Sequence, residues 1–546
     1  MKPRPFWLPV FTILLLGTGP LAAQGPVPRD AQALAEKIDA MLAARWVNDG
    51  AEPVPLADDA EYMRRVYLDL AGRIPTVPEA RAFLNDKRSD RRAKLVDSLL
   101  ASPRHVTHFT NVWRALLIPE ASNNFLVRAQ QGGFEAWLQQ RVKRNAGYDE
   151  IARDIITAPI TNQGFAALAN GGAPSPLAFY SAKEFKPENL AAGTARIFLG
   201  LSVECAQCHK HPFREWKREQ FWAFTAFYSG IQSQQFMDFL LPTKEVPDRH
   251  EIKIPGLDKV VQATFLDGSE PQWKEKVVTR QTLADWVTSP TNVYFRRAAA
   301  NRMWTYFFGH GLVEPLDEID GKAGDDGHRD LLDLLGQELA DHKFDTHYLI
   351  RAITASRAYQ LTSAADARDH SEPIQFARMP LRNLTGEQLF DSVAVATGLR
   401  NTGGGNNDLL AAITGGNKSP RAEFLTKFAI QADQATKPQS SILQALSLMN
   451  GKVVAEATSL DNSETLAAVV MAPFMTTNDR IETLYLAALA RKPSAKELER
   501  TTRFIDLAVK NAPATLDEEA RRAVYGNALA DVFWVLLNSS EFSLNH

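Results

Sequence analysis

The chain has 546 residues, of which 45% are hydrophobic and 23% are charged. This composition is typical of globular proteins, excludes a chain that is disordered over most of its length, and predicts two or three domains. The net charge of -3 provides no electrostatic attraction to nucleic acid or to anionic lipid, so we expect neither as a partner.

The N-terminus has the pattern of a secretory signal peptide. Lys2 and Arg4 precede an apolar run from Phe6 to Leu16, and the small residues that follow predict a signal peptide over residues 1–23. A leucine at the third position before the cut leaves an uncleaved signal anchor as the alternative. No later segment has the roughly 18 apolar residues that a membrane helix needs. We therefore expect a periplasmic or secreted protein without a transmembrane segment after cleavage.

The apolar periodicity predicts a mainly α fold, with two helical domains and a small β insertion between them. The first helical domain is expected over residues 24–235, and the capping-box pattern of Thr76 and Glu79 predicts a helix start within it. Alternating residues within 236–280 predict short strands, and 281–546 is expected to form the second helical domain. Helices are expected, among others, over residues 29–47, 189–201, 293–308, 328–342, 346–359, 385–397, 481–490 and 523–537.

The two cysteines of the chain lie three residues apart and are followed at once by a histidine, as Cys205, Cys208 and His209. This is the spacing of covalent c-type haem attachment. Two thiols at this distance reach the two vinyl groups of one porphyrin, and the histidine follows as the iron ligand. The sequence therefore predicts a haem c site.

The neighbouring sequence offers groups that a haem would need. Aromatic residues could line the macrocycle, although a packed core explains them equally well; they are Phe213, Trp216, Phe221, Trp222, Phe224, Phe227 and Tyr228. Basic residues could meet the propionates or merely face solvent; they are Arg214, Lys217 and Arg218. A histidine is more often an ordinary surface or core residue than a ligand. Candidates for a sixth iron ligand are His108, Met237, Met303 and His310.

Two other fates of the motif remain open. In an oxidising compartment Cys205 and Cys208 would form a disulfide unless another group takes them. Zinc could bind the two thiols with His209 and His211, although His209 follows Cys208 very closely for a tetrahedral site. The cofactor is therefore expected to be haem c, with zinc or none as alternatives.

Common enzyme signatures are missing from the sequence. It contains no phosphate-binding Gly-Lys-Ser/Thr loop, dinucleotide-binding glycine fingerprint, His-Glu-x-x-His pair or Gly-x-Ser-x-Gly elbow. Carboxylate pairs are frequent, but their spacing alone does not identify an acid and a base. Whether the chain is an enzyme therefore stays open.

Long stretches of the chain resemble a pair of domains of unknown function from secreted planctomycete proteins. The first is similar in RRVYLDLAGRIPTVPEARAFLND and CAQCHKHPFREW, and the second in NRMWTYFFGHGLVEPLDEI and RIETLYLAALARKPSAKELERTTRFI. The resemblance implies an exported, largely helical, cytochrome-associated protein, often encoded near sulfatase-like proteins. In longer relatives the first domain often follows a cytochrome c-like domain. This chain lacks one, so any haem would be held by the CAQCH segment.

These observations favour an exported c-type haem protein that transfers electrons to or from a periplasmic or cell-surface partner, such as a sulfatase-like protein. The alternative is a non-enzymatic scaffold or glycan-associated module, in which Cys205 and Cys208 form a disulfide or a metal site. A hydrolase would need a cleft of convergent carboxylates or a metal.

Overall fold

The computed structural model describes residues 29–160, 173–212, 214–232, 244–273, 277–319, 328–364, 373–399, 420–427 and 452–546. The predicted signal peptide, Phe213 and Met237 lie outside these ranges. Within them, no helix combines the length and the apolar character needed to cross a membrane.

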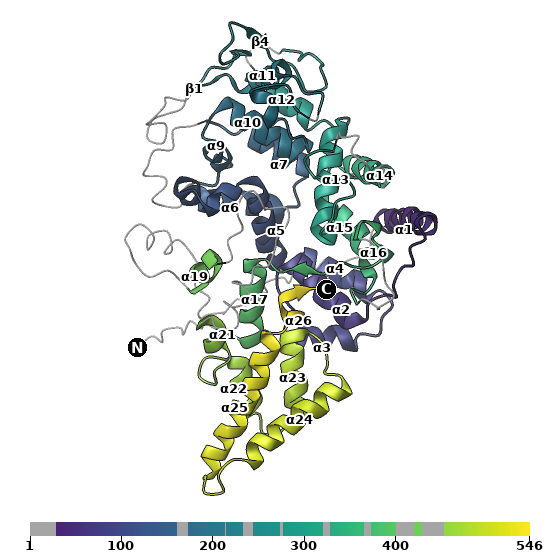
Figure 1. The fold of residues 1–546 in the computed structure, drawn as a ribbon, viewed down its shortest axis with the longest axis vertical. Coiled ribbons are helices and arrows are strands. Elements are labelled where there is room, and N and C mark those ends of the chain that lie inside the picture. The colour runs from purple at the N-terminus through teal and green to yellow at the C-terminus, as the bar shows by residue number, and fades with distance from the viewer. Residues whose placement is uncertain are drawn as a thin grey trace, which may run out of the picture.

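The predicted mainly α fold is confirmed (Figure 1). The helices of the first half are α1 (Arg29–Asp49), α2 (Asp59–Ala71), α3 (Val77–Asn85), α4 (Arg91–Leu100), α5 (Pro103–Leu117), α6 (Phe125–Lys143), α7 (Tyr148–Ile156), α9 (Ala178–Ala182), α10 (Pro187–Thr194) and α11 (Arg218–Thr225). Short turns between and after them are η1 (Pro119–Ser122), η2 (Ala195–Leu199), η3 (Glu204–Gln207) and η4 (Ala226–Tyr228).

The second half continues the helical pattern. Its helices are α12 (Thr279–Val287), α13 (Val293–Phe308), α14 (Arg329–Asp341), α15 (Thr346–Ala355), α16 (Arg357–Gln360), α17 (Gly386–Thr397), α19 (Pro420–Lys427), α21 (Lys452–Ala457), α22 (Glu464–Met471), α23 (Thr477–Leu489), α24 (Ala495–Lys510), α25 (Glu518–Leu537) and α26 (Ser540–Ser543), with the short turn η5 (Pro373–Gln375). Figure 1 shows α11 and α12 at one end of an elongated molecule and α24 at the other.

Local sequence signals explain where several helices begin and end. The backbone N–H of Glu79 donates to the Thr76 hydroxyl, and the Glu79 carboxylate accepts from the Thr76 N–H, which forms the expected capping box of α3. Helix α13 has the expected bounds and ends at Gly309, whose φ of 72° is the left-handed conformation that glycine adopts without strain.

The strands are short and antiparallel. β1 (Ile231–Gln232) pairs with β2 (Lys244–Glu245), β3 (Glu251–Lys253) with β4 (Val260–Gln262), and β5 (Arg382–Asn383) with β6 (Leu544–Asn545). Strands β2, β3 and β4 fall within the β insertion predicted for residues 236–280, whereas β1 lies just before it. The third pair, which sequence reasoning missed, returns the C-terminus to the middle of the molecule beside α2 (Figure 1).

The apolar interior consists of two clusters that meet at α2. The larger cluster takes residues from Ala31 to Met379 and adds Leu486 and Ala490, so both halves of the chain share it. The smaller cluster consists mainly of residues from the C-terminal helices, joined by Leu68 of α2 and by one other residue of the first half. Helix α2 therefore contributes to both clusters, with Met63, Val66 and Leu70 in the larger one and Leu68 in the smaller one.

Three buried charged residues of α2 hold the C-terminal part of the chain. Arg64, Arg65 and Asp69 are each at most 1% exposed, and each makes several hydrogen bonds or ion pairs. Their partners are the carbonyls of Ala488, Glu541 and Phe542 for Arg64, the Glu61 carboxylate and the carbonyls of Tyr359, Leu361 and His546 for Arg65, and the side chains of Tyr359, Arg382 and Asn545 for Asp69. Because a buried charge is costly without partners, these contacts fix the C-terminal segment against α2.

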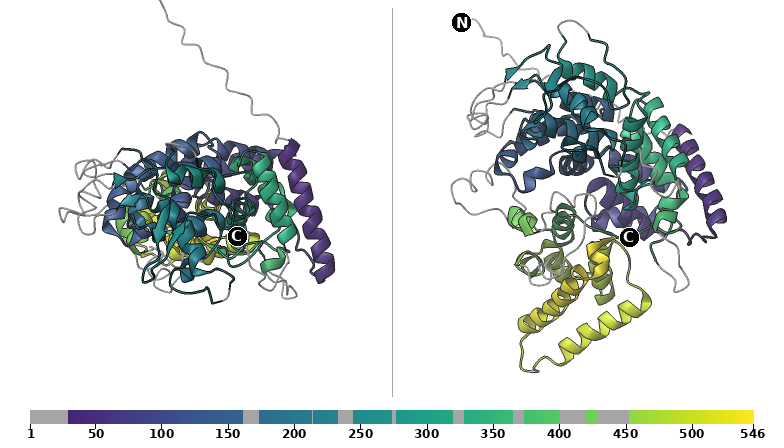
Figure 2. Two further views of the ribbon diagram at one scale, coloured as in Figure 1. Left: turned by 90° about the horizontal axis from the view of Figure 1, so that it is seen from above. Right: turned by 45° about the horizontal axis from the view of Figure 1, so that its top comes forward.

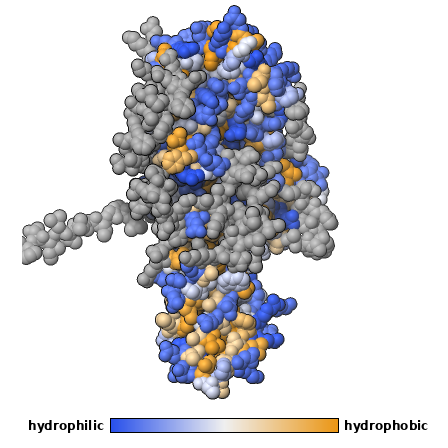
Figure 3. Space-filling model, turned by 60° about the vertical axis from the view of Figure 1, so that its left-hand side comes forward, coloured by the Kyte–Doolittle hydropathy of each residue, from blue (hydrophilic) through white to orange (hydrophobic). Residues whose placement is uncertain are grey.

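Two surface features complete the fold. Helix α1 lies along the outer edge of the molecule, where it packs against α15 (Figure 2). Apolar side chains also gather on the end formed by the C-terminal helices (Figure 3), where Met471 and Phe474 are 77% and 85% exposed.

Candidate functional site

The chain is clamped just before the cysteine motif. Helix α10 continues through the π-helical turn η2 to Gly200, which has a left-handed φ of 63°. A Cβ atom at Gly200 would lie 2.8 Å from Cδ1 of Ile319, so the site requires glycine. The Ile319 N–H donates to the Gly200 carbonyl at 3.1 Å, and Leu201 pairs with Glu318. The residues just before the motif are therefore held in place by the second half of the chain.

The two cysteines lie on either side of a buried alanine. The 3₁₀ turn η3 contains Ala206, which is fully buried and whose N–H donates to the Val203 carbonyl at 3.0 Å. Cys205 and Cys208 are both exposed and carry free thiols. The turn thus anchors itself through its small middle residue and presents both sulfur atoms to solvent.

Helix α11 holds the carbonyl group that precedes Cys208. The indole Nε1 of Trp222 donates to the Gln207 carbonyl at 3.0 Å, and Nε of Arg218 donates to the same oxygen at 3.2 Å. Arg218 also donates to the Pro255 carbonyl at 2.5 Å, in the loop between β3 and β4. The motif is therefore tied to the β insertion as well as to α11.

The ring of His209 is oriented by the backbone. His209 is exposed, and its Nδ1 lies 2.7 Å from the Lys210 carbonyl. A carbonyl only accepts, so Nδ1 carries the hydrogen, and in the neutral ring Nε2 is the nitrogen with the lone pair. Histidines that bind metals commonly donate their second ring N–H to a carbonyl in this way. The exposed thiols and the His209 tautomer fit the attachment chemistry of a c-type haem.

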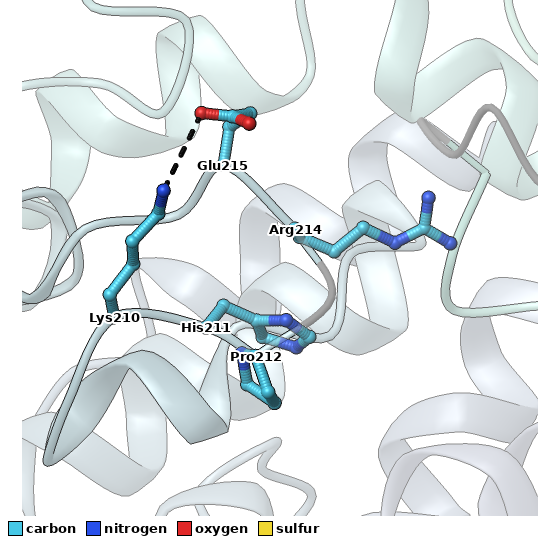
Figure 4. Close-up of a pocket in the computed structure, with 5 residues that line it drawn as sticks. All are labelled: Lys210, His211, Pro212, Arg214 and Glu215. Carbon is cyan, nitrogen blue, oxygen red and sulfur yellow. Dashed lines mark ion pairs between the residues drawn. The ribbon is translucent and has the colours of Figure 1, made fainter.

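An open pocket of about 390 Å³ follows the motif (Figure 4). It is lined by Lys210, His211, Pro212, Arg214 and Glu215. Lys210 and Glu215 face each other at 3.9 Å, while Arg214 extends away and binds the Glu318 carboxylate at 2.5 Å. His211 is 7% exposed, and its N–H donates to a backbone carbonyl at 2.9 Å. Charged side chains thus border the surface next to His209.

Comparison with known families identifies both halves of the chain. Residues 37–233 match PSCyt2, a protein of unknown function (DUF1549), and residues 279–505 match PSD1, a protein of unknown function (DUF1553). The chain joins a PSCyt2 domain to a PSD1 domain. This confirms the resemblance seen in the sequence. No curated protein matches the chain, and no solved structure does.

Most of the aromatic residues that were considered as a haem wall are buried in the core of the PSCyt2 domain, while Trp216 is half-buried. Phe221, Trp222, Phe224, Phe227 and Tyr228 are each at most 4% exposed. The Phe227 ring stacks on the Phe265 ring with centroids 4.9 Å apart. Their density is explained by packing, and the basic side chains of Arg214 and Arg218 already have protein partners.

The distant candidate ligands lie on other elements. His108 of α5 is buried, and its Nε2 lies 2.7 Å from the Tyr306 hydroxyl of the PSD1 domain. Burial lowers the pKa of His108 to about 4. Met303 is buried in α13, and His310 lies partly exposed just after that helix.

Zinc binding would require the side chains of Cys205, Cys208, His209 and His211 to converge on one point. Over the described ranges, no group of three or more His, Cys, Asp or Glu side chains is arranged to hold a metal ion. The side chains of Cys205, Cys208, His209 and His211 are therefore not drawn together as a zinc site in this conformation.

A histidine pair outside the motif, formed by the buried His105 and the half-buried His347, was not predicted. His105 donates from Nδ1 to the Leu70 carbonyl at 3.0 Å, and its Nε2 lies 3.2 Å from Nε2 of His347. Burial lowers the pKa of His105 to about 3 and that of His347 to about 4. The two residues are 242 positions apart, one in each family match, so no local signal could have revealed the pair.

Proposed function

We propose that this protein is an exported c-type haem protein whose haem is attached at Cys205 and Cys208 and ligated by His209. The observation that carries the proposal is the geometry of one turn. Two exposed free thiols flank a buried alanine, and the following histidine is held with Nδ1 on a carbonyl and Nε2 open. The family name PSCyt2 and the spacing of the motif agree with this chemistry.

Attachment of the haem needs no oxidant and releases no leaving group. Each thiol adds across one vinyl double bond, so that a carbon–sulfur bond forms at the carbon next to the ring and the thiol hydrogen goes to the terminal carbon. No atom is lost, and the mass of the product is the sum of protein and haem. His209 would hold the iron through Nε2, and the Lys210 carbonyl keeps its ring oriented for this role. When bound, the iron supplies one-electron oxidation and reduction.

The surface position of the motif supports electron exchange with another protein. Cys205, Cys208 and His209 are all exposed, and the adjacent pocket is bordered by charged side chains. A group attached here lies at the surface, where a partner can approach it. With the N-terminal signal pattern, we place this exchange in the periplasm or outside the cell. The partner is a periplasmic or cell-surface protein, for which a sulfatase-like protein is one candidate.

A second candidate function rests on the same thiols. Two exposed cysteines in an oxidising compartment form a disulfide when nothing else takes them. The protein would then be a helical scaffold or a glycan-associated module without a redox cofactor.

Expression in a bacterial host with the machinery for c-type cytochrome maturation distinguishes the two functions. The pyridine haemochrome spectrum separates two thioether bonds from one. We expect the two-bond spectrum for the wild type, the one-bond spectrum with lower yield for Cys208→Ala, and a lower haem yield for His209→Ala. His342→Gln, at the residue that caps the C-terminus of α14, is the matched control and keeps the wild-type yield. A colourless wild-type protein that carries a disulfide would establish the scaffold instead.

A further inference from the structure

We propose that Trp222 and Arg218 are positioning residues for the two thiols, because they fix the carbonyl of Gln207 and with it the direction of the turn. This inference rests on the proposed function for its haem readout. The orientation of the two thiols can also be measured without haem.

The Gln207 carbonyl stands at the end of a helical turn. In a continuing α-helix it would accept the N–H of the residue four positions later, His211. That N–H instead donates to the Trp216 carbonyl at 2.9 Å. The carbonyl would be left without a helical partner, and the two side chains of α11 replace the missing donor. Trp222 and Arg218 therefore act as a side-chain cap at the second cysteine.

Both donors are themselves held in place. Trp222 is 4% exposed, and its ring packs edge-on against Phe221 with centroids 5.5 Å apart. Arg218 also donates to the Pro255 carbonyl, so its guanidinium joins the turn to the β3–β4 loop. These contacts hold both donors in place. Through them the Gln207 carbonyl is held against α11 and the β3–β4 loop.

The pinned carbonyl belongs to the peptide group that carries the N–H of Cys208. Fixing that peptide plane fixes the backbone at Cys208, which has φ −104° and ψ −37°. Cys205 lies one turn earlier, so the relative direction of the two thiols depends on this plane. Loss of a donor frees the plane, and reactions that need both sulfur atoms at once slow more than reactions that need only one.

The test uses the full-length reduced protein without haem. Phenylarsine oxide bridges two thiols, whereas iodoacetamide alkylates each thiol alone. We expect Trp222→Phe to weaken arsenical binding by about three- to tenfold, the effect of one lost hydrogen bond. The alkylation rate should stay within about twofold, and the haem yield in the maturation host should fall.

The chain supplies a matched control for the loss of a buried indole. Trp304 is fully buried, and among the described residues its Nε1 has no hydrogen-bond partner. Trp304→Phe should therefore leave the ratio of arsenical binding to alkylation unchanged. Arg218→Met gives a second test that removes a donor from a partly exposed side chain, and it should weaken arsenical binding in the same sense.

The outcomes separate this inference from the proposed function. Equal arsenical binding in the wild type, Trp222→Phe and Arg218→Met would overturn the positioning role, as would an equal loss in Trp304→Phe. A wild type that takes no haem, but whose arsenical binding falls only when a donor to Gln207 is removed, would retain the positioning role and refute the haem proposal.

Discussion

Acid should destabilise the protein through three histidines at the junction of its two family domains. His105 and His108 lie on α5, and His347 lies on α15. Burial lowers their pKa values to about 3, 4 and 4, respectively, from the ordinary value of 6.5. As the pH falls below 6.5, the unfolded chain binds protons at these sites while the folded chain does not. The stability that these groups contribute is therefore complete above pH 6.5 and is lost as the pH falls toward 4.

The size of the effect follows from the same values. One pKa unit corresponds to about 1.4 kcal/mol, so the 1.5 units between 6.5 and pH 5 cost about 2 kcal/mol for each histidine. The three together cost at most about 6 kcal/mol, a large fraction of the 5–15 kcal/mol that is typical of a folded domain. Charged neighbours oppose one another at His347, where Asp345 and Asp97 raise the pKa and Arg351 lowers it. Burial therefore sets the direction of the pKa shift of His347.

Scanning calorimetry between pH 7 and pH 5 measures this loss. We expect the melting temperature of the wild type to fall steeply below pH 6.5, and that of His347→Gln to fall about a third less. His342→Gln replaces a partly exposed histidine and should follow the wild type. Identical pH profiles for the wild type and His347→Gln would refute the role of these histidines.

Two further substitutions test the frame around α2 and the motif. Asp69→Asn should destabilise the protein by about 3 kcal/mol or more in urea unfolding, because it leaves the Arg382 guanidinium buried without its charge partner; a loss below about 1 kcal/mol would contradict this. Gly200→Ala should destabilise the protein more than Gly256→Ala, since both glycines have positive φ but only the Cβ at Gly200 meets a neighbour, Ile319. Equal losses of stability in the two variants would show that backbone strain alone determines the cost. A normal haem yield in Gly200→Ala would show that the contact of Gly200 with Ile319 does not position the motif.

Local signals were sufficient to predict much of the helical fold. The capping box of Thr76 and Glu79 and the stop at Gly309 depend on residues a few positions apart, so the sequence determines them directly. The pairing of β5 with β6 and the contacts of Asp69 depend on residues more than 150 positions apart, which no periodicity reports.

The residues of the candidate site also fall into those that local sequence signals reveal and those that they do not. Cys205, Cys208 and His209 could be found because the attachment chemistry requires them next to one another in sequence. The donors to the Gln207 carbonyl could not be found, since they come from 11 and 15 residues later and act on a backbone atom. The nearby aromatic residues were ambiguous because a core and a ligand pocket call for the same residue types.

The most direct test of the central claim is the intact mass of the wild-type protein exported from a host with c-type maturation machinery, read together with its reduced-minus-oxidised visible spectrum. The haem proposal predicts sharp reduced bands and a mass increased by one complete haem, with no atom lost. A colourless protein whose mass is lower by two hydrogen atoms would show a disulfide between Cys205 and Cys208 and would contradict the proposal.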